Sequence, residues 1–141
     1  MAKFQVRPTV GVTAETFRMG AKAAPLVDAD MGKAVKIGAE SQVVLAGAND
    51  EIFGFASSLE SGTQDGYKLG GVITYGYAYV DTGTASVGDL VVVDSNPAAG
   101  TAGKTKVKKG AAAVYTEGSE AVATPSKYLW EVVHPGVIRR V

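Results

Sequence analysis

The chain has 141 residues, no cysteine, and 14 lysine and arginine residues against 14 aspartate and glutamate residues. The lack of cysteine excludes disulfide bonds, zinc–thiolate sites and cysteine nucleophiles. The zero net charge argues against nucleic acid as the main partner, because proteins that bind phosphate backbones are usually strongly basic. No apolar run approaches the roughly 18 residues of a membrane span, and the N-terminal residues lack the apolar centre of a secretory signal. We therefore expect synthesis in the cytoplasm and no membrane partner.

The composition predicts strands in place of helices. Glycine, with 18 residues, is abundant, valine and alanine dominate the apolar residues, and leucine is scarce. Such a composition favours β-strands and turns. The length fits one domain better than two. We therefore predict a single all-β domain over residues 1–141.

Short extended runs follow one another along the chain. Most alternate apolar and polar residues, and Leu90–Val93 is continuously apolar, which predicts a strand buried on both faces. The predicted strands are Lys3–Val10, Ala34–Ile37, Gln42–Ala46, Glu51–Leu59, Tyr67–Val80, Leu90–Val93, Lys104–Lys108, Tyr128–Val133 and Val137–Val141.

Turns and one ambiguous segment separate these strands. Pro8 indicates an edge position or a strand end for the first run. Gly38–Ser41 is predicted to close a hairpin, and Ser61–Gly66 to form an exposed loop. Ala14–Ala24 is open to a second interpretation as a short helix, although its apolar positions fit a 3.6-residue period poorly.

Tyr67–Val80 gives the strongest strand signal. Tyr75, Tyr77 and Tyr79 share one face of it, because side chains repeat every second residue along a strand. The glycine and alanine between them lie on the opposite face, which another element can approach closely.

Two motifs resemble ligand-binding loops but depart from them. Gly103-Lys104-Thr105 is similar to the end of a phosphate-binding loop, yet Ala98 replaces the first glycine and a strand follows in place of a helix. Asp28-Ala29-Asp30 is similar to the start of a calcium loop, yet Ala39 stands where the bidentate glutamate belongs. We predict a hairpin and a turn at these places, without nucleotide or metal.

Catalytic constellations are not evident in the sequence. His134 is the only histidine, so a histidine cluster for a metal cannot form, and a triad would depend on this residue alone. No serine sits in a Gly-x-Ser-x-Gly elbow. Asp50 and Glu51 flank a loop end, where carboxylates are solvated. We predict that the protein is not an enzyme and needs no cofactor.

Four lysines cluster late in the chain, at Lys104, Lys106, Lys108 and Lys109. We favour a solvated edge strand, whose charges discourage aggregation between strand edges. A basic patch that meets an acidic surface of a partner is the alternative.

Several segments resemble the small cement (decoration) proteins of tailed-bacteriophage heads. In that family a short turn with a Gly-Asp pair leads into an apolar strand, as Gly88-Asp89 leads into Leu90–Val93 here. The lysine-rich residues 104–109 and the Tyr128–Trp130 strand have no counterpart in that pattern. The segments that carry the resemblance are Met1–Phe4, Gly32–Ile37, Ile52–Ala56, Gly76–Val80 and Ala85–Asp94.

The resemblance implies a fold and a role. The fold would be a compact β-sandwich or jelly-roll-like barrel. The protein would be made in the bacterial cytoplasm and end in the virion. There it would bind the major capsid protein on the outside of the assembled shell, as a dimer or trimer.

Aromatic residues are favoured anchors at such contact surfaces. We assign Trp130 to the core and expect the terminal segments 1–10 and 137–141, least enclosed by sequence neighbours, to act as interface arms. The candidate interface residues are Lys3, Phe4, Val6, Tyr75, Tyr77, Tyr79 and Tyr128.

Two other functions share this composition. One is a phage tail or baseplate component. The other is a small carbohydrate-binding β module, which should show exposed aromatic rings beside polar groups; Tyr67 near Asp65 is the candidate for that role.

Overall fold

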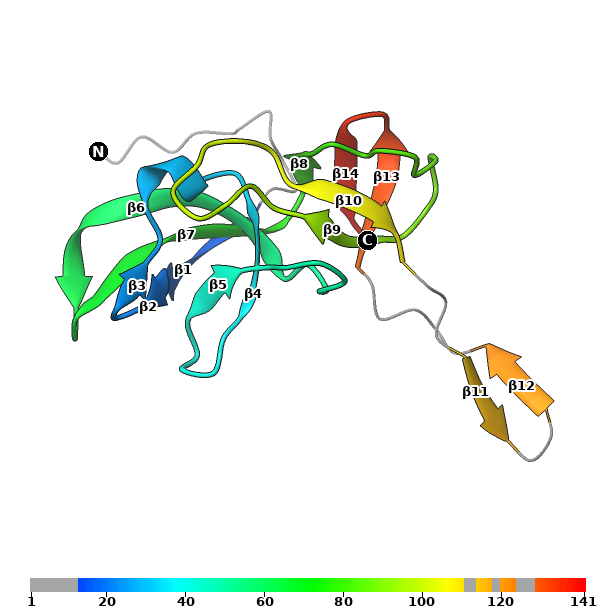
Figure 1. Ribbon diagram of the computed structural model, residues 1–141, viewed down its shortest axis with the longest axis horizontal. Coiled ribbons are helices and arrows are strands. Elements are labelled where there is room, and N and C mark those ends of the chain that lie inside the picture. The colour runs from blue at the N-terminus through cyan, green and yellow to red at the C-terminus, as the bar shows by residue number, and fades with distance from the viewer. Residues whose placement is uncertain (1–12, 111–113, 118–119, 124–128) are drawn as a thin grey trace, which may run out of the picture.

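The computed structural model describes residues 13–110, 114–117, 120–123 and 129–141 (Figure 1). A short 3-10 turn, η1 (Asp28–Asp30), is the one helical element of these residues. None of their helices is long and apolar enough to cross a membrane. The strands are β1 (Thr13–Arg18), β2 (Gly20–Ala21), β3 (Ala24–Pro25), β4 (Ala34–Ile37), β5 (Val43–Leu45), β6 (Gly54–Gln64), β7 (Tyr67–Tyr75), β8 (Tyr77–Tyr79), β9 (Val91–Ser95), β10 (Lys106–Lys109), β11 (Val114–Glu117), β12 (Glu120–Ala123), β13 (Trp130–His134) and β14 (Val137–Arg140).

The all-β prediction is confirmed, and the strands form two main antiparallel sheets. The larger sheet has the order β1-β7-β6-β4-β5, and the smaller has the order β13-β14-β8. The pairs β9–β10, β11–β12 and β2–β3 form two-stranded sheets of their own. Figure 1 shows β9–β10 between the two main sheets, while β11–β12 extends away from the rest of the molecule.

In the first half of the chain, one alternative interpretation is excluded and one prediction is corrected. Ala14–Ala24 is not helical, because β1 pairs along its whole length with β7 and the chain turns at Gly20, whose φ is +89°. The predicted loop Ser61–Gly66 is mostly strand, since β6 runs on to Gln64 and a tight turn follows at Asp65 and Gly66. The predicted hairpin around Gly38–Ser41 is confirmed by the pairing of β4 with β5.

The run Tyr67–Val80 is divided at Gly76, not a single strand. Gly76 has a φ of +119°, which favours glycine, and the chain bends there from β7 into β8. As a result β7 lies in the larger sheet and β8 is an edge strand of the smaller one. One sequence run thus joins the two sheets.

Two apolar clusters form the interior. One lies on the larger sheet, around Met19, Val35 and Val72. The other lies around Trp130, which packs edge-on against Phe55 with ring centroids 5.1 Å apart. Trp130 is only 1% exposed, in agreement with its assignment to the core. Of the run Leu90–Val93, predicted to be buried on both faces, Val91, Val92 and Val93 are buried and Leu90 is half-buried.

A buried hydrogen-bond hub attaches the β9–β10 hairpin to the larger sheet. The side-chain amide of Asn96 donates to the carbonyl oxygens of Ala34, at 3.1 Å, and Ala46, at 2.6 Å. The hydroxyl of Thr105 accepts from the Ala34 N–H at 2.8 Å and donates to Asn96 Oδ1. Because Thr105 and Ala34 are fully buried, the Thr105 hydroxyl and the Ala34 N–H have no water to replace a lost partner.

A buried ion pair holds the loop between β9 and β10. Lys33 and Asp30 are 0% and 1% exposed, with 2.7 Å between Nζ and Oδ1. Lys33 also donates to the carbonyl of Ala98 at 3.0 Å, and the Gly100 N–H donates to Asp30 at 2.9 Å. Burial opposes ionisation of Asp30, but hydrogen bonds from Lys33, Gly100 and Val27 outweigh it and lower the pKa of this carboxyl.

The hub can be tested by removing one hydroxyl. Thr105→Val keeps the shape of the side chain but leaves the Ala34 N–H and Asn96 Oδ1 without this partner. A buried polar group without a partner costs about 1–3 kcal/mol, so the free energy of unfolding in urea should fall by at least that amount. The control Thr105→Ser keeps the hydroxyl and loses one methyl group, worth about 1 kcal/mol. A Thr105→Val variant with the same free energy of unfolding as the unmodified protein would contradict this role.

The ion pair predicts a pH dependence of stability. Because folding lowers the pKa of Asp30, the pair stabilises the folded state above the ordinary carboxyl pKa of 3.8, and this contribution is lost as the pH falls through the lowered value. The stability difference between the unmodified protein and Asp30→Asn, from urea denaturation, should be largest at neutral pH and shrink in acid. Glu60→Gln, at an exposed position, controls for general charge effects. A difference that stays constant with pH would count against the pair.

Candidate functional site

The outer face of the smaller sheet is the main exposed aromatic surface of the described residues. Strand alternation turns Trp130, Val132 and Ile138 inward, where each is at most 1% exposed. The residues between them therefore point outward. We define the tyrosine face as Tyr77, Tyr79, Glu131 and Arg139 of this sheet, together with Tyr75, which is exposed at the adjoining end of β7.

The three tyrosines are presented to solvent together. Tyr75 is 49% exposed, Tyr77 50% and Tyr79 71%, while the intervening Gly76 and Ala78 are buried. The predicted alternation of this run therefore persists through the bend at Gly76. Large aromatic side chains exposed in a row are uncommon on a protein surface that contacts only water.

A charged pair lies beside the tyrosines. Arg139 on β14 is opposite Tyr77 on β8 and Glu131 on β13 in the register of the sheet. Its guanidinium donates to Glu131 Oε1 at 2.6 Å. The hydrogen bond to Glu131, with a contribution from the Tyr77 hydroxyl, raises the pKa of Arg139, so its charge is fixed. The row Tyr77–Arg139–Glu131 offers a ring, a cation and an anion side by side.

The structure places only some of the predicted interface residues. Tyr77 and Tyr79 share β8 and Tyr75 is exposed at the end of β7, whereas Lys3, Phe4, Val6 and Tyr128 lie outside the described residues. Sequence reasoning missed Arg139 and Glu131. The period-two pattern of the last two strands contains the signal, since Glu131 lies between the buried Trp130 and Val132, and Arg139 follows the buried Ile138.

The predicted arm at 137–141 is corrected. β14 lies between β13 and β8 in the sheet, and Ile138 is completely buried. This segment is ordered by strands of its own chain and supplies Arg139 to the tyrosine face. The segment 1–10 lies outside the described residues.

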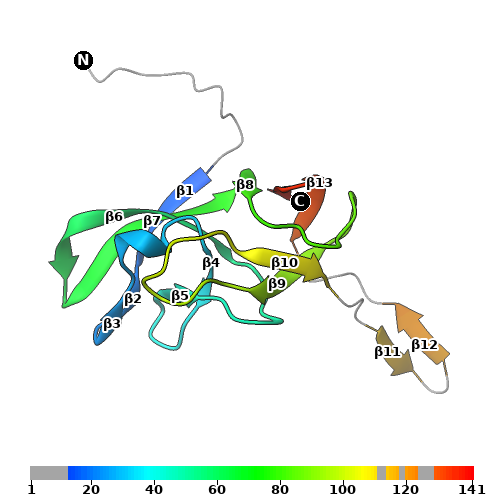
Figure 2. The same ribbon diagram turned by 45° about the horizontal axis from the view of Figure 1, so that its top comes forward.

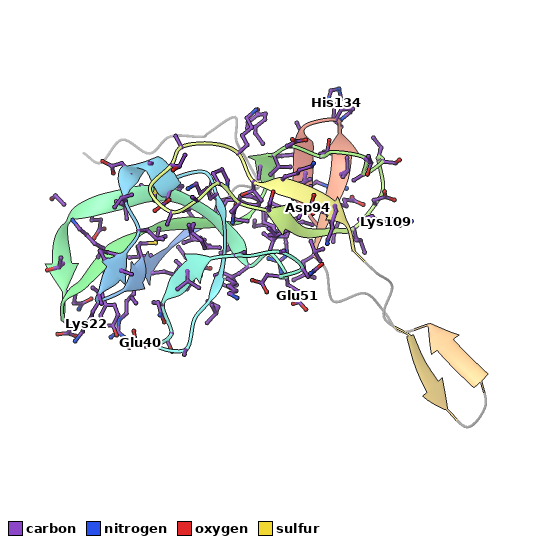
Figure 3. The ribbon with its side chains drawn as sticks, in the orientation of Figure 1. Lys22, Glu40, Glu51, Asp94, Lys109 and His134 are labelled. Carbon is purple, nitrogen blue, oxygen red and sulfur yellow. The ribbon has the colours of Figure 1, made fainter. Side chains whose placement is uncertain are left out.

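The two motifs that resemble a phosphate-binding loop and a calcium loop have structural roles. Thr105 belongs to the buried hub, and a strand follows it, so no helix N-terminus faces the Gly103–Thr105 segment. Both carboxylate oxygens of Asp30 accept hydrogen bonds from within the protein. Among the described residues no three acidic or histidine side chains group to hold a metal ion. Figure 3 shows His134 at the turn after β13, apart from Asp94 and Glu51.

Tyr67, the candidate for sugar stacking, is not available for it. Its side chain is 7% exposed, and the cations of Arg18 and Lys22 lie 4.5 Å and 5.3 Å from the ring centroid. Burial and a hydrogen bond to Glu40 raise the pKa of Tyr67. Figure 3 shows Lys22 and Glu40 at this same end of the larger sheet.

Comparison with known proteins gives no family for this chain: no family model, no curated protein and no solved structure matches it.

The assignment of outward and inward positions has a direct test. Tyr79→Ser alters an exposed side chain and should change the free energy of unfolding by less than about 0.5 kcal/mol. Ile138→Ala empties a buried position on the neighbouring strand and should cost about 2–5 kcal/mol. Thermal unfolding measures both. A strongly destabilised Tyr79→Ser would show that the tyrosine face is covered by the protein's own chain.

Proposed function

We propose that this protein is a non-enzymatic structural protein of the virion, a cement protein of a bacteriophage head. It binds the outer surface of the assembled capsid and stabilises the shell across boundaries between copies of the major capsid protein. The resemblance of its sequence segments to that family supports the role, and the observation that carries it is the tyrosine face.

The tyrosine face has the properties of a protein-binding surface. Tyrosine and arginine are enriched where partners meet and often dominate the binding energy. The face is built on strands whose inward residues are buried, so little conformational entropy is lost when it docks. A sheet face fixed in this way suits a rigid, repeated target such as a shell of identical subunits.

The stabilising effect follows from linkage. A protein that binds the finished shell, and not free subunits, lowers the free energy of the assembled state alone. Each site need contribute only a few kcal/mol, because the effect repeats at every joint. A dimer or trimer gains further from multivalent attachment.

The test is cosedimentation of the purified protein with heads of the phage that encodes it, stripped of this protein. It should bind mature heads and not free capsid subunits, and restore the resistance of the heads to heat. Tyr77→Ala/Tyr79→Ala should weaken binding at least about tenfold, or 1.4 kcal/mol. The control Val27→Ser alters an exposed apolar residue outside the tyrosine face and should bind normally. Equal binding to free subunits would contradict the proposal.

A carbohydrate-binding module is the second candidate, favoured by one observation. Tyr77 lies in register with Arg139, which pairs with Glu131, so a ring that can stack on a sugar is next to groups that can bind hydroxyls. Glycan-array binding that is lost in Tyr77→Ala, with no binding to heads, would favour this function.

A further inference from the structure

A pocket of about 340 Å³ lies where one end of the smaller sheet meets the larger sheet. Its walls come from β4, from the segment that leads into β6, and from the ends of β13 and β14. Figures 1 and 2 both mark the C-terminus next to β13, and the Val141 N–H donates to the Leu129 carbonyl at 2.7 Å beside the pocket. Sites for small ligands typically have volumes of about 300–1,000 Å³. The pocket is therefore large enough for one small molecule or one side chain.

Most of the pocket wall is apolar. Ile37, Ile52, Phe53 and Leu129 all line it. Ile37 is 48% exposed and Leu129 41%, so part of this apolar surface is in contact with water. Removing apolar surface from water is favourable, whichever molecule covers it. The wall thus suits the apolar part of a ligand.

Arg140 brings a positive charge to the same wall. It occupies the inward position of β14 opposite the buried Trp130, whereas its neighbour Arg139 points outward and pairs with Glu131. Its Nη1 donates to the Thr74 carbonyl at 2.8 Å, while its Nε is buried and has no hydrogen-bond acceptor. None of the described carboxylates forms an ion pair with it. A buried donor without an acceptor is unfavourable, so this guanidinium gains from an anionic acceptor.

The other charges of the pocket limit the charge of its ligand. Lys36 lines the pocket and is paired with Asp50, with 2.8 Å between Nζ and Oδ2. Glu51 also lines the pocket and adds a negative charge. Because these two carboxylates balance the charges of Lys36 and Arg140, a second negative charge on a ligand would meet repulsion. A monoanion is therefore favoured over a dianion such as phosphate.

We propose that this pocket binds a small apolar monocarboxylate, with the carboxylate at the guanidinium of Arg140 and the apolar part against Ile37 and Leu129. The planar guanidinium matches the geometry of a carboxylate. A small rotation of the Arg140 side chain toward the ligand would let Nε donate as well. The site uses none of the residues of the tyrosine face, so it goes beyond the proposed attachment to a shell and is independent of it.

Titration of the full chain with a matched pair of probes tests the site. 4-Methylpentanoate carries a leucine-like body and one carboxylate, and 4-methylpentanamide has the same shape without the charge. The acid should shift backbone amide resonances of residues 37, 51–53, 129 and 140 saturably, with a dissociation constant of about 1 mM. The amide should bind at least about tenfold more weakly, and inorganic phosphate should not displace the acid. Equal affinity for acid and amide, or no saturable shift, would overturn the proposal.

Substitutions locate the binding. Ile37→Glu places a carboxylate at an exposed position of the wall and should lower the affinity for the acid at least about tenfold, through repulsion and lost apolar contact. Val27→Glu makes the same change at an exposed apolar residue outside the pocket and should bind normally. Arg140→Lys keeps the charge but loses the planar fork and should also weaken binding. Unchanged affinity in Ile37→Glu would overturn the proposal even if Arg140→Lys fails to fold.

The same carboxylate chemistry has two sources, a free organic acid and the carboxyl end of a polypeptide whose last residue is apolar. A short peptide that ends in leucine with a free carboxylate, compared with its amidated form, separates them. Preference for the free-carboxylate peptide over 4-methylpentanoate would identify a chain terminus as the ligand, and the reverse preference a free acid. Both results support the site, whereas equal binding of the two peptide forms together with equal binding of acid and amide contradicts it.

Discussion

The buried ammonium group of Lys33 is the constraint on which the placement of the β9–β10 hairpin against the larger sheet depends. A charge without water around it is tolerated only with a carboxylate and further acceptors close by. Asp30 and the Ala98 carbonyl meet this need, so the loop after β9 must lie against the start of β4. The neighbouring hub of Asn96 and Thr105 depends on the same placement. Polar groups, not apolar packing alone, thus determine how the β9–β10 hairpin meets the larger sheet.

The position of the tyrosine face depends indirectly on the packing of the interior. Trp130 packs on Phe55, which lies on β6 of the larger sheet, and so fixes β13 against it. β14 and β8 follow through backbone pairing, and their outward residues become the rows of the face. The face is therefore held in place by the packing of Trp130 on Phe55 and by the backbone pairing of β13, β14 and β8. Its own side chains contribute little to stability. A surface of this kind can change in sequence without loss of the fold.

Local patterns predicted most strands but not their partners. The alternation of apolar and polar residues was sufficient to predict the β4–β5 hairpin and the exposed tyrosines, because both features depend on residues that are close in sequence. The alternation gave no sign that Lys33 and Asp30 are buried. Their burial depends on hydrogen bonds with the backbone of Ala98 and Gly100, which are distant in sequence. The bend at Gly76 was also missed. A glycine within a strand indicates an irregularity, but the switch between sheets is a consequence of long-range pairing.

The central position of β14 has a consequence for the order of folding. β8 is made in the middle of the chain, yet its partner in the smaller sheet is β14, and the whole stretch from β9 to β13 is synthesised between them. Pairing over such a separation carries a large loop-closure cost and is slow. In the larger sheet the pairs β4–β5, β4–β6 and β6–β7 join strands that are closer in sequence, so this part can form first. During synthesis β8 therefore remains without its only strand partner, with both edges unpaired and its tyrosines exposed, and this nascent stage is where the chain is most vulnerable to aggregation.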